Sequence, residues 1–265
     1  MRFELNPDRA PTGPTGFPPW RGESLAGKSI LVLTEQGFGD HIQMCRFAQT
    51  LKARGASRVT LTCRWPLSPL LAMAPGVDAV TTYQPGQDLD LDRHDYWSHY
   101  FSLPELLGVT LETLPAAPYL AAPAERRARW AGYGGVGLCW RTSPSGFNAV
   151  NKNLPADEAE RLLALGMISL HPEDTGARDF ADTAAIIEQL DLVISVDTAV
   201  AHLAGALGKP CWLLAPYLGL DWRWLRGRTD SPWYPSMKLY RLAAPGAWAA
   251  MVDAVSADLA VFHPG

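Results

Sequence analysis

The sequence lacks the features that mark several large classes of protein. Its 23 Lys and Arg and 27 Asp and Glu give a formal net charge of −4 over 265 residues. Because no basic stripe is present, nucleic acid is not expected as a partner. No stretch approaches the roughly twenty consecutive apolar residues that a membrane span needs. The first 19 residues are polar and rich in proline, so we expect neither a signal peptide nor an anchor there.

Cysteine is also scarce. The four cysteines lie far apart and form no Cys-x-x-Cys pair: they are Cys45, Cys63, Cys139 and Cys211. This spacing predicts no zinc site, and three of the four occur in apolar stretches where a cysteine behaves as a small buried hydrophobic residue. We therefore expect a reduced cytoplasmic protein with no bound metal.

The chain instead alternates short apolar runs with helical patterns, which is typical of β-α-β units and parallel sheets. Hydrophobic residues make up 48% of the chain, enough for a fully globular core. The expected strands are residues 29–34, 58–62, 79–82, 136–140, 167–170, 192–196 and 211–214. The expected helices are residues 40–54, 66–74, 103–107, 125–130, 157–165 and 183–190, one helix from residue 198, and residues 247–259. The segment 83–99 is expected to be irregular.

A chain of this length fits two domains of ordinary size. We predict an α/β protein with two doubly wound domains that face a central cleft, residues 1–122 and 123–246. A final segment, residues 247–265, is predicted to form a helix that packs back on the first domain. In such sheets ligands bind beyond the carboxyl ends of the strands, so candidate site residues are expected there.

The most informative stretch follows the strand 192–196, which ends at Asp197 and Thr198, where a helix is predicted to begin. A strand that ends at a helix N-terminus directs unpaired backbone N–H groups and the positive end of the helix dipole at one point. This arrangement suits a diphosphate. His202 follows Thr198 by four residues and so lies on nearly the same helix face. The stretch therefore predicts a nucleotide site.

A second candidate is the turn between the first strand and the first helix. Gly37 and Gly39 let the backbone approach a ligand closely, and Asp40 stands where an N-cap would. Asp40 is either a simple cap of its own helix or a general base that faces an acceptor hydroxyl. The full Gly-x-Gly-x-x-Gly spacing is missing, so no dinucleotide fingerprint is predicted.

Further polar and aromatic residues fall after predicted strands. Arg141 and Lys152, in the polar loop after the first strand of the second domain, are either ordinary surface residues or contacts to phosphate. His171 and Glu173 follow the next strand, on a rim where a nucleoside could be held, although a His-Pro pair can simply form a turn. The aromatic residues of 221–235 can equally stack on a base or sugar or lock the last elements to the domain interface.

Three segments together resemble one known type of sequence. They are residues 35–40 with Ile42 and Gln43, residues 179–208, and residues 221–224 with 231–235. The set is similar to the glycosyltransferase module at the C-terminus of many bacterial tetratricopeptide-repeat proteins. That module is similar to glycosyltransferase family 9, the ADP-heptose:lipopolysaccharide heptosyltransferases, and more distantly to O-linked N-acetylglucosamine transferases. The resemblance covers nearly the whole chain from about residue 20 and implies a GT-B fold of two Rossmann-like domains. In that fold the second domain binds the nucleotide-sugar donor and the first faces the acceptor.

The resemblance also implies roles for individual residues. The Asp-Thr-(Gly/Ala)-x-x-His donor motif of the family is matched by Asp197, Thr198, Ala199 and His202. In this pattern the backbone N–H groups of Thr198 and Ala199 would bind the diphosphate. Asp40 matches the residue that is the proposed base in heptosyltransferases.

The chain departs from the family pattern at several positions. Lys152 agrees with the pattern, because relatives tend to carry a basic residue near the phosphates at this position. Gln43 departs from it, because heptosyltransferases tend to have a histidine there. Ala199 replaces a glycine, and residues 171–174 replace a segment that more often reads Gln-Lys-Gly. These changes bear on donor identity more than on the fold. No repeats precede the module, so a tetratricopeptide-repeat segment is either absent or on another chain.

We therefore predict a metal-independent inverting glycosyltransferase that moves a sugar from a nucleotide-diphosphate sugar to a hydroxyl of a glycan or protein. Asp40 is the predicted base, and the helix from Thr198, assisted by Lys152 or Arg141, is predicted to stabilise the leaving diphosphate. No cofactor is expected, because the nucleotide sugar is itself a co-substrate. Two alternatives stay open: a nucleotide-sugar epimerase or hydrolase, and a non-catalytic scaffold that binds a nucleotide sugar. The sequence does not identify the sugar, or the nucleotide among ADP, GDP and UDP.

Overall fold

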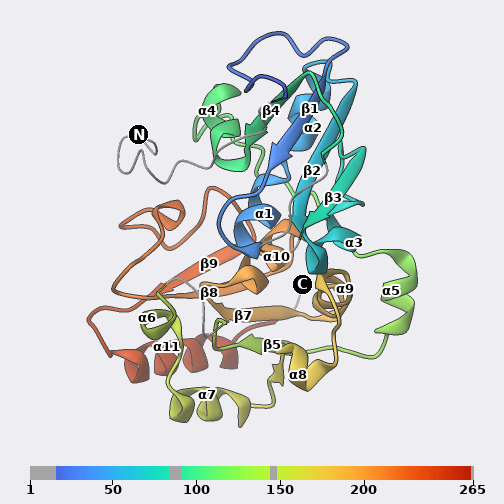
Figure 1. Ribbon diagram of the computed structural model, residues 1–265. Coiled ribbons are helices and arrows are strands. Elements are labelled where there is room, and N and C mark those ends of the chain that lie inside the picture. The colour runs from blue at the N-terminus through green and yellow to red at the C-terminus, as the bar shows by residue number, and fades with distance from the viewer. Residues whose placement is uncertain (1–15, 84–90, 144–147, 264–265) are drawn as a thin grey trace.

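The computed structural model describes residues 16–83, 91–143 and 148–263. Within these residues the strands form two parallel sheets, one of four strands in the order β3-β2-β1-β4 and one of five in the order β6-β5-β7-β8-β9. The first sheet lies in the upper half of Figure 1 and the second in the lower half. Both strand orders are those of doubly wound α/β units, as predicted.

The first half is built around β1, which pairs in parallel with β2 on one side and β4 on the other. Its elements are β1 (Ser29–Leu33), α1 (Phe38–Met44), α2 (Phe47–Ala53), β2 (Arg58–Arg64), η2 (Trp65–Leu67), α3 (Ser68–Leu71), β3 (Ala79–Tyr83), β4 (Tyr96–His99), η3 (Tyr100–Ser102) and α4 (Leu103–Leu106). β4 lies in the segment expected to be irregular, of which residues 84–90 are outside the described ranges. Its Tyr-Trp-Ser-His sequence has no apolar run, so its strand conformation depends on pairing with β1.

The single helix predicted over residues 40–54 is wrong, because the structure has two helices that meet at Cys45 and Arg46. Side chains donate hydrogen bonds to carbonyl groups at the end of the first helix. The Arg46 Nε donates to the Gln43 carbonyl at 2.8 Å, and the Tyr119 hydroxyl donates to the Ile42 carbonyl at 2.8 Å. One local and one tertiary hydrogen bond thus occupy carbonyl groups where the regular ladder of α1 ends.

The second half contains all the remaining elements. They are α5 (Ala124–Arg129), β5 (Val136–Cys139), α6 (Ala149–Lys152), α7 (Ala156–Leu163), β6 (Ile168–Ser169), α8 (Pro172–Thr175), α9 (Phe180–Gln189), β7 (Leu192–Val196), α10 (Ala199–Ala206), β8 (Cys211–Ala215), η4 (Trp222–Trp224), β9 (Met237–Arg241) and α11 (Trp248–Ala260). β9, α6 and α8 were not predicted. β9 extends the sheet by pairing in parallel with β8.

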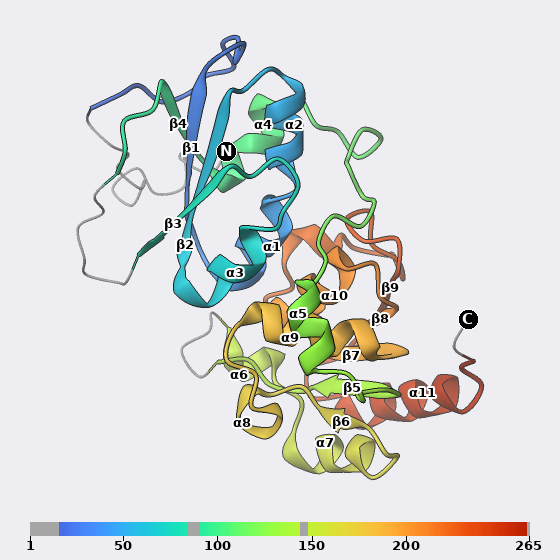
Figure 2. The ribbon, with the colours of Figure 1, turned by 90° about the vertical axis from the view of Figure 1, so that its right-hand side faces the viewer.

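The prediction that the C-terminal helix packs back on the first domain is wrong. The apolar face of α11, formed by Trp248, Met251, Val252 and Val255, belongs to a buried cluster made of second-half residues such as Leu162. Figure 2 shows α11 beneath the second sheet, on the side away from the first half. Helix periodicity predicts that this face is buried, but it does not specify which surface covers it. A second buried cluster joins the two halves through α1, α2, α9 and α10.

The described residues include no helix that is long and apolar enough to cross a membrane. The four cysteines, all within the described ranges, are buried free thiols. Burial raises the pKa of Cys45 and of Cys63 to about 12, so both thiols are protonated at neutral pH and unreactive as nucleophiles.

Candidate functional site

Two helix starts meet at the junction of the halves. Helix α1 follows β1 and helix α10 follows β7, and Figure 1 shows the two helices between the sheets. A Cβ atom on Gly39 would lie 2.6 Å from Cδ2 of His202 and 3.4 Å from Cα of Ala199. The glycine at position 39 therefore lets the start of α1 pack directly on the start of α10.

The helix α10 begins as predicted, with Thr198 as its N-cap. The Thr198 Oγ1 accepts a hydrogen bond from the Val200 N–H at 3.2 Å and lies 3.1 Å from the Ser195 Oγ. The first N–H groups of any α-helix lack intrahelical acceptors and attract an anion. β7 lies next to β5, where the strand order of the second sheet reverses, and open α/β sheets bind ligands at such a point.

Asp197 is buried at the carboxyl end of β7 and is held from two sides. Its Oδ2 lies 2.8 Å from the Lys152 Nζ, and its Oδ1 accepts a hydrogen bond from the Trp224 Nε1 at 3.1 Å. Because Asp197 directly precedes the N-cap Thr198, the ion pair holds the Lys152 ammonium near the start of α10. The structure thus brings together Asp197 and Lys152, two residues that the sequence placed 45 positions apart without predicting their contact.

His202 lies within α10 and is enclosed by aromatic side chains. Its Nδ1 lies 2.9 Å from the Tyr234 hydroxyl, and its ring stacks on Trp224 with the ring centroids 5.1 Å apart. Burial, followed by the positive charge of Arg223, lowers the pKa of His202 well below its usual value. The imidazole is therefore neutral at pH 7, and it packs against the start of α1.

Asp40 is the third residue of α1, and the predicted N-cap assignment is wrong because the cap is Gly37. The Oδ2 of Asp40 accepts a hydrogen bond from the Gly37 N–H at 2.7 Å, which closes the first turn of α1. Its Oδ1 accepts a hydrogen bond from the Arg223 Nη1 at 2.6 Å. One carboxylate oxygen thus stabilises the helix start while the other faces the second half of the chain.

Arg223 is a site residue that the sequence did not predict. It lies in η4, is almost fully buried and bonds to Asp221 as well as to Asp40. The signal available in the sequence is the Asp-Trp-Arg-Trp segment, which contributes to the family resemblance and to the aromatic cluster but predicts no role for its arginine. Of those aromatic residues, Trp224, Trp233 and Tyr234 are buried at the junction of the halves, whereas Trp222 is 60% exposed. The interface role therefore holds for the three buried residues.

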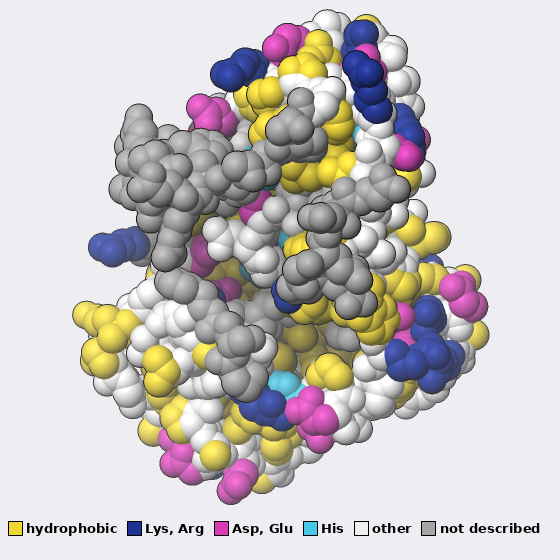
Figure 3. All heavy atoms as spheres, viewed as in Figure 1, with side chains coloured by type: hydrophobic (Ala, Val, Ile, Leu, Met, Phe, Trp, Pro, Cys, Tyr) yellow, Lys and Arg dark blue, Asp and Glu magenta, His cyan; other side chains and the backbone are white. Residues whose placement is uncertain are grey.

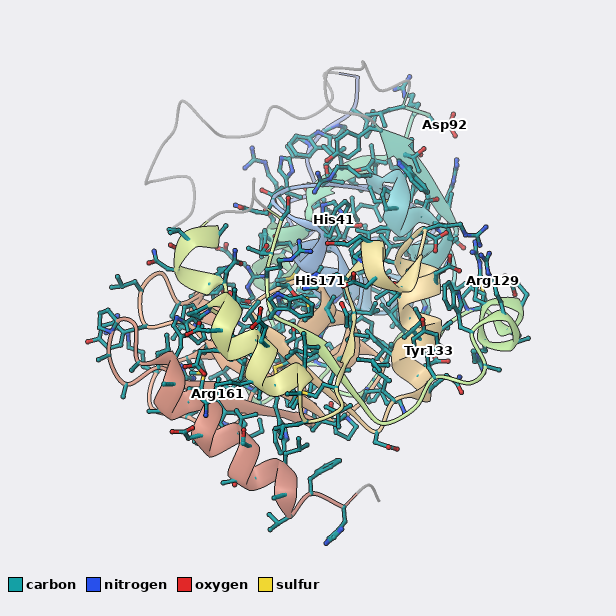
Figure 4. The ribbon with its side chains drawn as sticks, turned by 90° about the horizontal axis from the view of Figure 1, so that it is seen from below. His41, Asp92, Arg129, Tyr133, Arg161 and His171 are labelled. Carbon is teal, nitrogen blue, oxygen red and sulfur yellow. The ribbon has the colours of Figure 1, made fainter. Side chains whose placement is uncertain are left out.

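His171 and Glu173 lie with Arg141 on a rim at the carboxyl ends of β5 and β6. The His171 ring packs edge-on against Trp140 with centroids 4.2 Å apart, and no described residue bonds to its buried Nε2. Burial, followed by the charge of Arg141, lowers the pKa of His171. Figure 4 places His171 near the middle of the molecule, whereas Arg129 lies at its edge. In Figure 3, histidine atoms lie between basic and acidic side chains on the lower half of the molecule.

The acidic residues of the site are each paired with a cation. The pairs are Asp40 with Arg223, Asp197 with Lys152, and Glu173 with Arg141. Among the residues that the structure describes, no group of three or more His, Cys, Asp or Glu side chains is placed to hold a metal ion. The chemistry that these groups offer is hydrogen bonding to an anion and proton transfer by a carboxylate.

The sequence profile of glycosyltransferase family 9 (heptosyltransferase) matches residues 171–214. That interval runs from the N-cap of α8 to β8 and includes Asp197 and the whole of α10. Over this interval the chain is similar to the heptosyltransferases of glycosyltransferase family 9, and it is referred to below as the module. Protein FlbA of Caulobacter vibrioides is 28% identical to the module over 290 aligned residues, which cover 92% of this chain and 48% of FlbA. The module therefore spans about half the length of this relative.

Solved structures confirm the predicted fold. The E. coli ADP-heptose LPS heptosyltransferase II has a TM-score of 0.58 at 15% identity, covering 88% of the module and 98% of that chain. A glycosyltransferase family 9 protein of Veillonella parvula has a TM-score of 0.57 at 15% identity, covering 83% of the module and 87% of that chain. At these identities the likeness establishes the GT-B arrangement of two Rossmann-like halves. The tetratricopeptide-repeat context stays a prediction.

Proposed function

We propose that the module transfers a sugar from a nucleotide-diphosphate sugar to an acceptor hydroxyl, with inversion at the anomeric carbon and without a metal ion or other cofactor. The observation that carries this proposal is the packing of the Asp40-bearing start of α1 on the start of α10. A Cβ on Gly39 would lie only 3.4 Å from Cα of Ala199, the first residue of α10. A carboxylate of the first half therefore lies on a helix start that packs against the start of α10 in the second half.

The donor diphosphate is proposed to bind at the start of α10. The N–H groups of Thr198 and Ala199 would donate to its oxygens, and Lys152 would supply a positive charge. As the bond to the sugar breaks, negative charge grows on the diphosphate, and fixed dipoles at this helix start would stabilise it. The nucleoside is proposed to lie over the rim, where the buried Nε2 of His171 would gain a hydrogen-bond partner.

Asp40 is proposed to take the proton of the acceptor hydroxyl. Each oxygen of an ionised carboxylate has two lone pairs, so hydrogen bonds from Gly37 and Arg223 leave one on each oxygen for the acceptor. The acceptor oxygen would then bond to the anomeric carbon as the diphosphate leaves from the opposite face. The proposed acceptor is a glycan or a protein, and the proposed location is the cytoplasm. A tetratricopeptide-repeat segment is a proposed partner.

The donor class is tested first by thermal shift with ADP, GDP, UDP and their sugars, because a ligand that binds only the folded chain raises its unfolding temperature. ADP-heptose is the first sugar to test, since it is named for the structurally similar E. coli heptosyltransferase II. Transfer is then measured with the stabilising donor, with and without EDTA. An unchanged rate in EDTA is expected, and loss of the rate would contradict metal independence.

The base is tested with Asp40→Asn, which keeps the shape of the side chain but cannot accept the proton. The transfer rate should fall on the order of a hundredfold or more, while the dissociation constant for ADP changes little. Asp92→Asn is the matched control, because Asp92 is an exposed aspartate paired with Arg58 far from the site. Wild-type turnover by Asp40→Asn would refute the base assignment. Consumption of the donor in the absence of an acceptor would favour an epimerase or hydrolase. Binding of the donor without any turnover would favour a scaffold.

A further inference from the structure

The guanidinium of Arg223 joins the two halves at the proposed base. Its Nε and Nη2 donate to the two carboxylate oxygens of Asp221 at 2.7 Å each. Its Nη1 donates to the Asp40 Oδ1 at 2.6 Å and to the Gln43 Oε1 at 2.9 Å. These four bonds use four of the five N–H groups that a guanidinium carries. Arg223 is thus bound on one edge by its own loop and on the other by α1.

The two acceptors on α1 lie three residues apart and therefore on one face of the helix. The planar guanidinium has a fixed fork of donors, so its orientation toward that face is set by Asp221. Burial alone would lower the pKa of Arg223, but hydrogen bonds and charge from Asp221 and Asp40 raise it. The group stays charged, and it cannot exchange a proton with Asp40.

The short helix that carries Arg223 also contacts the donor side. Trp224, the next residue, donates its Nε1–H to Asp197 at 3.1 Å and stacks on His202. The single turn of η4 therefore contacts both halves. Arg223 binds Asp40, the proposed base, and Trp224 binds the Asp197 carboxylate beside α10. The separation between Asp40 and the start of α10 is fixed by this turn together with the Gly39 contact.

We propose that Arg223 is a positioning residue that orients the Asp40 carboxylate toward the acceptor and fixes the carboxylate relative to the donor helix. This inference rests on the proposed function of Asp40. With Oδ1 held by Arg223 and Oδ2 held by the Gly37 N–H, the carboxylate plane has one orientation. Without Arg223 the plane is free to rotate, and a shift of about 1 Å in a reacting group can cost a hundredfold in rate.

The kinetic test compares Arg223→Lys, Arg223→Ala and Asp221→Asn, with Arg228→Ala as the control. Arg228 pairs with Asp230 across the same two-residue spacing, but both side chains of that pair are exposed. Using the donor that the thermal-shift screen identifies, kcat should fall roughly a hundredfold for both Arg223 variants and less for Asp221→Asn. The dissociation constant for ADP should stay within about threefold, and Arg228→Ala should match wild type.

Millimolar guanidinium chloride separates positioning from simple stability. It should restore part of the kcat of Arg223→Ala in a saturable manner, because the free cation can bind between Asp221 and Asp40. It should not restore Asp40→Asn. The proposal is overturned if kcat falls together with the unfolding temperature or with ADP binding and guanidinium does not restore it. Arg223 would then have a structural role. Wild-type kcat in Arg223→Lys and Arg223→Ala would overturn it as well.

A double-mutant cycle on unfolding needs no substrate. Asp40→Ala, Arg223→Ala and the double variant are unfolded in urea, and the two single effects should not add if the side chains are in contact. Additive effects would show that the pair does not form in solution, and the proposal would fail. If Asp40→Asn is fully active, the base assignment fails. If Asp40→Asn is inactive while the Arg223 variants are fully active, only the positioning role fails.

Discussion

Replacing Gly39 by Ala should separate the two halves at the candidate site. The added methyl carbon would lie 2.6 Å from Cδ2 of His202, whereas two carbon atoms prefer a separation of roughly 3.5–4.0 Å. His202 cannot turn aside without loss, because its Nδ1 bonds to the Tyr234 hydroxyl and its ring stacks on Trp224. Helices α1 and α10 must therefore move apart.

Overpacking of this kind costs about 1–3 kcal/mol, and the higher helix propensity of Ala returns at most about 1 kcal/mol. With the full return subtracted, a net loss of up to about 2 kcal/mol remains. Each kcal/mol lowers the unfolding midpoint by about 2–4 °C in a chain of this size. The transfer rate should fall on the order of a hundredfold, because Asp40 moves relative to the donor helix.

Calorimetric unfolding and the transfer assay measure the two effects. Gly134→Ala is the matched control, since a Cβ there would meet nothing within 4 Å and the backbone of Gly134 is not left-handed. That variant should unfold and turn over like wild type. If Gly39→Ala also matches wild type in both assays, the close packing of α1 on α10 does not exist in solution and the reasoning is refuted.

Two further substitutions probe the buried charged and titratable groups. Lys152→Met leaves the Asp197 carboxylate buried without its cation, so the free energy of unfolding in urea should fall by about 3 kcal/mol. A variant as stable as wild type would contradict the importance of this ion pair. Burial, with a smaller effect from the charge of Arg64, lowers the pKa of His41 to about 4, so the unfolded chain binds a proton that the folded chain does not. The contribution of His41 to the free energy of unfolding is therefore fully present above a pH of about 6.5. It falls by about 3 kcal/mol as the pH drops to about 4. His41→Phe should flatten this decline, and an unchanged slope in urea unfolding between pH 7 and 4.5 would refute it.

Local sequence patterns determined most of the sheet framework. The strand expected over residues 192–196 has the observed bounds, Leu192–Val196, and Thr198 caps the helix after it. Both features depend on residues within a few positions of each other: an apolar run, and a hydroxyl next to a free N–H. The same local signals predicted two doubly wound halves. They were insufficient for β4, whose short Tyr-Trp-Ser-His sequence has no apolar run and which pairs in parallel with β1.

The candidate site was predicted in its parts, but its assembly came from tertiary structure. Asp40 and the start of α10 were found from turns and caps, yet Arg223 lies 183 residues from Asp40 and no periodicity relates the two. The pairing of Asp197 with Lys152 likewise depends on how a loop folds over a strand end.

The sequence by itself determined most of the strands and helices and the capped start of α10, because these follow from interactions between near neighbours. Only the tertiary structure decided where α11 packs and which cation meets Asp40. The sequence shows that an apolar helix face must be buried and that a buried carboxylate must be paired. It does not show with which residues, because those partners lie far away in the chain and are brought close only by the packing of the tertiary structure.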